Sequence, residues 1–186
     1  MRGLLHRRLV RIALILLAAA AITGPPLFVY SGVYDVAATR PHTPPVYWAL
    51  ITTSRRSIQT HAEREAPQPP NLADPELVER GMVLYDSLCL VCHGAPGIAP
   101  GPVGLGLTPT PSNLVLRGRD RTAREIYWTI TNGLKMTGMP AWQFRLTERE
   151  RWAIVALVQA LPTLAPAEYS ARRARLVPRS GRDGKP

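Results

Sequence analysis

Both cysteines of this chain lie three residues apart, and a histidine follows the second cysteine directly. The motif is Cys89-Leu90-Val91-Cys92-His93. A cluster of this kind suits three chemistries: half of a zinc site, a thiol–disulfide switch, or the covalent attachment of a haem. Each chemistry requires something different from the rest of the chain, so this motif is the feature that most restricts the possible folds.

The rest of the sequence lacks what zinc or disulfide chemistry would need. Structural zinc takes four protein ligands, usually from a second close pair of Cys or His, and His6, His42 and His61 form no such pair. A redox C-x-x-C motif normally accompanies a βαβ pattern, whereas no strand is predicted here. A disulfide that closes only two residues would add little stability. The spacing favours haem, because two thiols on one helical turn can bond the two vinyl groups and His93 can coordinate the iron.

Electron-transferring haem iron commonly takes a second axial ligand, often a methionine on a separate loop. Two methionines follow the cysteines, Met136 and Met139, within the segment NGLKMTGMPAW. Gly138 permits a close approach to a ring, and Pro140 restricts the backbone just after the candidate ligand. We therefore favour Met139 and keep Met136 as the alternative.

The N-terminus has the layout of an export signal. No charged residue occurs between Arg11 and Asp35, a run of 23 residues, which as a helix of ~34 Å is long enough to cross a bilayer. The preceding arginines predict a cytoplasmic N-terminus and an exported main body. Gly24-Pro25-Pro26 and the alanines before it would suit a cleavable signal peptide. Because the apolar run resumes afterwards, we expect an uncleaved membrane anchor over residues 1–34.

The formal net charge of +10 belongs to the two ends of the chain. Residues 12–170 carry 13 basic and 12 acidic side chains, so a nucleic-acid-binding domain is not expected. The tail, residues 165–186, is rich in arginine and polar, and we expect it to be disordered. Arg117, Arg119, Arg121 and Arg124 lie close together and form either a docking patch or an ordinary solvated surface.

Between the anchor and the tail, the pattern predicts helices separated by Gly/Pro-rich loops. Residues 35–70 are a linker with a spacer helix over 46–65, whose Tyr47 and Trp48 either lie at the membrane surface or pack on the domain. Residues 71–164 form the haem domain. Its three main helices are predicted from one N-cap, Asp74, two capping boxes, Thr122/Glu125 and Thr147/Glu150, and a C-terminal stop at Gly133.

Residues 75–162 resemble the class I c-type cytochromes, in particular the small, membrane-anchored, single-haem bacterial type. The resemblance is carried by CLVCHG, the Gly/Pro-rich loop after it, and NGLKMTGMPAW before a closing apolar helix. It implies an all-α domain with one covalently attached haem c per chain. It also implies Cys89 and Cys92 as thioether anchors, His93 as proximal ligand and Met139 as distal ligand.

The resemblance further implies two packing features. The first and last helices of the domain should meet, with Gly81 and Tyr85 against Trp152 and Val155. A proline carbonyl in the loop after the histidine should accept a hydrogen bond from the Nδ1 atom of His93. The candidates are Pro100, Pro102, Pro109 and Pro111.

The function implied is electron transfer, without an enzymatic activity of its own. We expect the chain in the bacterial inner membrane, with the haem domain in the periplasm. Its partners would be redox proteins: a quinol-oxidising complex, a terminal oxidase or a periplasmic dehydrogenase. One alternative is a dedicated electron-entry or electron-exit subunit of such a complex, and another is a haem-based ligand sensor. The sequence does not indicate the oligomeric state.

Overall fold

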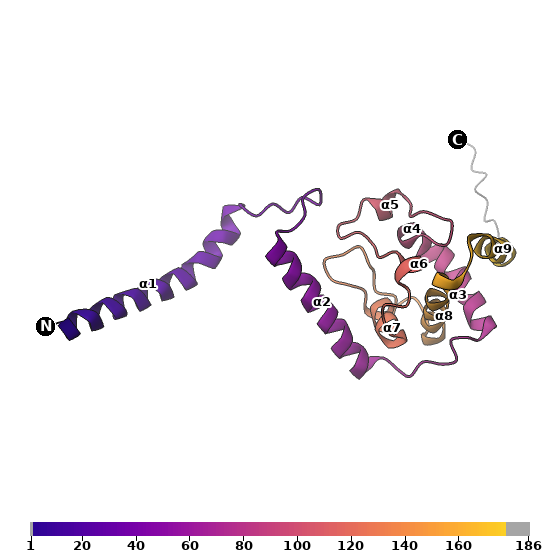
Figure 1. Ribbon diagram of the computed structural model, residues 1–186, viewed down its shortest axis with the longest axis horizontal. Helices are drawn as coiled ribbons and strands as arrows, with labels where there is room; N and C mark the ends of the chain where they lie inside the picture. The colour runs from indigo at the N-terminus through magenta and orange to yellow at the C-terminus, as the bar shows by residue number, and fades with distance from the viewer. Residues whose placement is uncertain (1, 178–186) are drawn as a thin grey trace. The chain divides into compact units, whose positions relative to one another are not determined.

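The structure is a computed structural model that describes residues 2–177, and it is all-helical over that range (Figure 1). The fold class predicted from the sequence is therefore confirmed. The chain divides into two compact units, one up to Pro41 and one from His42 onward. The helices are α1 (Arg2–Ser31), α2 (Pro44–Glu65), α3 (Pro75–Leu88), α4 (Leu90–His93), α5 (Pro102–Leu105), α6 (Leu114–Arg117), α7 (Ala123–Asn132), α8 (Glu148–Ala160) and α9 (Pro166–Leu176), with a 3₁₀ turn at Leu161–Thr163.

Helix α1 makes up most of the first unit. It continues through Pro25 and Pro26, as membrane helices tolerate proline better than soluble ones do. The segment His6–Ser31 is long and apolar enough to cross a membrane, with a mean hydropathy of 2.2. Its side chains have no protein neighbours that bury them, which suits a lipid environment.

The three main helices of the second unit begin where the sequence predicts. Asp74 accepts a hydrogen bond from the Glu76 N–H at the start of α3. Both capping boxes are formed, at the starts of α7 and α8. Gly133 ends α7 with φ 65°, a conformation that glycine adopts without strain.

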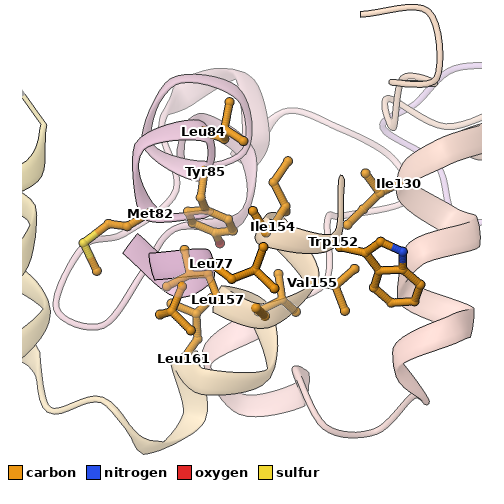
Figure 2. Packing of buried hydrophobic residues seen from close by; sticks show 14 of the residues in the cluster. Leu77, Met82, Leu84, Tyr85, Ile130, Trp152, Ile154, Val155, Leu157 and Leu161 are labelled. Carbon is orange, nitrogen blue, oxygen red and sulfur yellow. The ribbon is translucent and has the colours of Figure 1, made fainter. Parts of the chain in front are cut away.

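Helices α3 and α8 cross at very close range at Gly81. A Cβ atom on this residue would collide with the Ala153 carbonyl and lie 3.1 Å from Leu157 Cβ. Figure 2 shows Tyr85 and Leu77 beside Leu157 and Ile154, while Trp152 lies on the side of Ile130. The predicted pairing of the two helices is confirmed, but at Gly81 the residues on α8 are Ala153 and Leu157 rather than Trp152 and Val155.

We predict that Gly81→Ala destabilises the domain by about 1–3 kcal/mol, because the added methyl group has no space and the two backbones must separate. The measurement is the free energy of unfolding from a urea titration of the holoprotein. Gly106→Ala is the matched control, since its Cβ would meet nothing closer than 3.5 Å. Equal stability of the two variants would contradict the close crossing.

The second half of α2 packs on α7, at some distance in sequence. The Arg124 guanidinium donates to the Ala66 and Glu63 carbonyls at 2.7 and 2.8 Å, and so caps the C-terminal end of α2. Trp128 Nε1 donates to Glu65 Oε2 at 2.7 Å, and its ring stacks on His61. Ile58 and Ala62 are buried beneath these contacts. The spacer helix is thus attached to the domain by its second half.

The expectation of disorder from residue 165 onward is wrong for 166–176, which form α9. Tyr169 on this helix is completely buried. Arg173 forms a hydrogen-bonded ion pair with Asp86 of α3, and Arg175 pairs with Glu79 at 2.6 Å. The high arginine content of the tail predicts disorder only if these arginines have no partners. Their acidic partners lie on α3, far away in the sequence, and cannot be recognised from the tail alone. The rest of the expected tail, 178–186, lies outside the described residues.

We predict that Tyr169→Ala destabilises the holoprotein by about 3–5 kcal/mol, the usual loss for a large aromatic side chain in a core. Tyr169→Phe should cost less than about 1 kcal/mol, because the buried hydroxyl has no hydrogen-bond partner in the described residues. Urea unfolding of both variants checks this. If Tyr169→Ala leaves the stability unchanged, α9 does not pack on the domain.

Candidate functional site: a haem-attachment turn and a methionine loop

The C-x-x-C-H motif occupies the end of α3 and the single turn of α4. The Cys89 N–H still bonds the Tyr85 carbonyl of α3 at 2.9 Å, and its own carbonyl accepts from Cys92 and His93 at 3.1 and 3.0 Å. Both cysteines are free thiols. Because α3 is held against α8, the helix crossing determines where these three side chains lie.

The chain leaves this turn through a tightly held bend. Gly94 has φ 65°, and a Cβ there would lie 2.6 Å from the Ile98 carbonyl. Its own carbonyl accepts a 2.7 Å hydrogen bond from the buried Tyr85 hydroxyl. Ala95 and Ile98 then exchange a pair of backbone hydrogen bonds at 2.9 and 2.8 Å. The exit from the motif is therefore supported from α3 as well as by its own backbone.

The imidazole of His93 is oriented by a backbone carbonyl, but not by one of the four predicted prolines. Its Nδ1 atom lies 2.8 Å from the Ser112 oxygen, which corrects that expectation. A loop of many glycines and prolines offers several carbonyls, and only the folded path of the loop selects one. With Nδ1–H donating to this carbonyl, the Nε2 lone pair remains for a metal.

Burial affects the protonation of two groups in the motif. It lowers the pKa of His93, and the hydrogen bond to Ser112 partly opposes this effect. The imidazole is consequently neutral at neutral pH, the form in which it can ligate a metal. Burial, reinforced by the nearby Cys92, raises the pKa of the Cys89 thiol to about 12, so this thiol is protonated before attachment.

Helix α5 packs directly on the motif through Gly104. A Cβ on this glycine would lie 2.7 Å from Cys92 Cα and 2.8 Å from the Cys92 oxygen. The neighbouring Val103 and Leu105 on α5, and Val91 on α4, are exposed apolar side chains. Exposed apolar side chains thus occur on both α4 and α5, and the close contact between these two helices requires glycine at position 104.

We predict that Gly104→Ala lowers the fraction of the exported protein that carries covalent haem and destabilises the remainder by about 1–3 kcal/mol. The physical reason is that the methyl group would displace the backbone at Cys92. Covalent haem per protein, from the haemochrome spectrum in alkaline pyridine, measures the first effect. Gly106→Ala, two residues further on, should retain full attachment; an equal loss in both variants would rule out this explanation.

The two candidate methionines have different environments in the loop after α7. Met139 is partly buried and packs against the core; its N–H donates to Thr137 Oγ1 at 3.1 Å, and its carbonyl accepts from Leu134 at 3.2 Å. Met136 is 86% exposed and has φ 59°, a left-handed conformation unfavourable for its side chain. The backbone of Met139 is thus held on both sides, whereas Met136 lies at the outer tip.

Glycines allow this loop to fold closely. A Cβ on Gly133 would lie 2.7 Å from the Met139 oxygen, and a Cβ on Gly138 would lie 2.6 Å from a methyl carbon of Leu107. Gly138 was singled out from the sequence, whereas the contribution of Thr137 was not. A threonine two residues before the candidate ligand is the kind of signal that predicts a side-chain-to-backbone turn.

The arginines considered as a docking patch all have partners within the chain. Arg124 caps α2, and Arg119 Nε donates to the Gln159 carbonyl at 3.1 Å. Arg117 and Arg121 pair with Asp120 and Glu125 at 3.7 and 3.6 Å. These contacts support the interpretation of a structural, solvated surface over that of a dedicated docking patch.

Residues 76–158 match the family model described as cytochrome C oxidase, cbb3-type, subunit III. The match covers less than half of the chain and includes the attachment motif, α5 to α7 and most of α8. No curated protein matches the chain. Together with the motif, the match shows that this part of the chain is a c-type cytochrome domain. Its cofactor is haem c, an iron porphyrin bonded covalently to the protein.

The residues of this structure fit that cofactor. Two free thiols lie on one helical turn. The imidazole beside them has its Nδ1 atom engaged by Ser112, and its Nε2 atom has no hydrogen-bond partner among residues 2–177. Exposed apolar side chains lie on α4, which carries the motif, and on α5, which packs against it. The site therefore has the donors and the apolar surroundings that a covalently attached haem requires.

Proposed function

We propose that the chain is a membrane-anchored, single-haem cytochrome c of class I that transfers electrons between redox proteins. The haem iron supplies the chemistry by cycling between Fe(II) and Fe(III). Cys89 and Cys92 would attach the porphyrin, and His93 and Met139 would ligate the iron. The proposal rests mainly on the contrast in the second loop, where the Met139 backbone is held on both sides and Met136 is exposed.

The residues around the two ligands have supporting roles in this proposal. The Ser112 carbonyl orients the imidazole and raises its basicity through Nδ1–H. Thr137 fixes the backbone of Met139, so that little reorganisation accompanies a change in oxidation state. With both His93 and Met139 as ligands, the iron would offer small molecules no open coordination position. The protein would then act as an electron carrier without substrate chemistry of its own.

The N-terminal charges support the proposed position in the cell. Four arginines lie in the first eleven residues, at the N-terminal end of α1, and no charge follows until Asp35. This pattern supports a cytoplasmic N-terminus and a haem domain on the periplasmic side of a bacterial inner membrane. An uncleaved α1 would keep the domain close to membrane-bound partners such as a quinol-oxidising complex or a terminal oxidase. Intact-mass measurement of the membrane-extracted protein reports retention of α1 and the number of attached haems together.

A second candidate function is favoured by the family match. The family is described as an oxidase subunit, so the chain could serve as the electron-entry subunit of a membrane oxidase. Extraction in a mild detergent followed by gel filtration distinguishes the two. Co-elution with a haem-containing complex supports the subunit function, and elution as a separate protein supports a mobile carrier.

We predict that Met139→Ala abolishes the weak absorbance band of the Met–Fe(III) bond, lowers the reduction potential and allows carbon monoxide to bind the ferrous protein readily, because the distal position becomes open. Met136→Ala is the matched control in the same loop and should leave the spectrum and potential unchanged. Both are measured on the detergent-extracted holoprotein.

The reverse pattern would assign the distal position to Met136. Ready binding of carbon monoxide by the unmodified protein would instead favour the ligand-sensor function over electron transfer.

A further inference from the structure

The first half of α2 has an unusual surface. Segment Pro44–Ser54 contains no charged residue, and four of its large side chains are exposed, with Trp48 reaching 68%. The others are Tyr47, Leu50 and Ile51. At 100° per residue, these side chains cover roughly 160° of the helix circumference. A water-exposed, uncharged helix end of this kind requires a covering that its own domain does not provide.

This helix end is separated from the part of α2 that packs on the domain. Ile58 and Ala62 are buried, and the contacts of Arg124 and Trp128 attach the helix at its C-terminal end. The attachment fixes the direction of α2 relative to α7. The uncharged half is therefore a rigid extension of the haem domain and not a flexible part of the linker.

The backbone at the start of α2 suits a medium poor in water. The first N–H groups of a helix usually lack partners. The first two residues of α2, Pro44 and Pro45, have no N–H group that would need one. The Tyr47 N–H donates to the Thr43 carbonyl at 2.9 Å. Few unpaired donors thus remain at this end, which reduces the cost of moving it into lipid.

The position of α2 along the chain indicates what covers its exposed, uncharged half. The membrane-spanning segment ends at Ser31 and α2 begins at Pro44, so the connection reaches at most ~45 Å. The uncharged half is the part of α2 nearest the anchor along the chain. Tyrosine and tryptophan prefer the interface between lipid and water, and the exposed Arg55 and Arg56 follow where phosphate headgroups would attract them.

We propose that the first half of α2 docks into the headgroup region of the phospholipid bilayer that holds α1. The docking makes α2 a strut between the membrane surface and the haem domain. It gives the domain a defined orientation on the membrane instead of free rotation about a linker. This inference rests on the membrane anchoring in the proposed function, and goes beyond it because an anchor alone would leave the domain free.

The test uses the full-length holoprotein in nanodiscs of phosphatidylcholine and phosphatidylglycerol. Trp48→Cys reports on the uncharged half, and Thr60→Cys, an exposed position on the second half of the same helix, is the matched control. The two native cysteines are bonded to haem and do not react. The rate of alkylation by a membrane-impermeant maleimide is measured for each variant and divided by the rate of the same variant in guanidinium chloride.

Docking predicts a normalised rate at position 48 that is at least about tenfold below that at position 60, which corresponds to ~1.4 kcal/mol of protection. Adding Tyr47→Asn and Ile51→Asn to the Trp48→Cys variant should restore most of the rate. Equal rates at positions 48 and 60 overturn the proposal. Protection that appears only when two copies share a disc also overturns it, because a second copy would then be the covering.

The same samples separate this inference from the proposed function. Protein that remains with the disc and retains the Met–Fe band, yet shows equal rates, overturns the docking alone. Protein that remains with the disc and shows protection without that band overturns the axial ligation but supports the docking. Loss of the holoprotein from the disc overturns both the anchor and the docking.

Discussion

The close crossing of α3 and α8 at Gly81 is the contact on which the rest of the domain depends. Both cysteines and the histidine of the haem motif lie at the end of α3, so their positions follow from how that helix is held. Because only a hydrogen atom separates the Gly81 backbone from Ala153, the two helices lie close enough to interleave Tyr85, Leu77 and Leu157 (Figure 2). A larger residue would move the attachment turn together with its helix.

The second half of the proposed site lies in a different part of the chain, the loop after α7. Gly133 ends α7, and the polypeptide folds back so that the Met139 carbonyl bonds Leu134. Thr137 then holds the Met139 N–H. These are local interactions, but α7 itself is placed by its packing on α8, through Tyr127 stacked on Trp152 at 4.3 Å. One helix, α8, thus supports both halves of the proposed site.

Segments outside the family match complete the domain at its two ends. Helix α2 is joined to α7 by Arg124 and Trp128, and α9 is joined to α3 by Arg173. Neither attachment could be predicted from sequence, because each is a long-range pairing of polar groups that have many possible partners. The local signals were present for α9, with Pro166 in its first turn and an i,i+4 pair between Glu168 and Arg172.

The sequence by itself determined the three main helices of the haem domain, the haem-attachment motif and the short list of candidate distal ligands. These depend on spacing within a few residues: capping boxes, C-x-x-C-H, and glycine or proline beside a methionine. The tertiary structure decided which carbonyl meets His93, which residues meet Gly81, and which half of α2 is covered. It also decided that α9 packs on the domain. Those outcomes depend on contacts between residues far apart in the chain, and spacing along a sequence does not specify them.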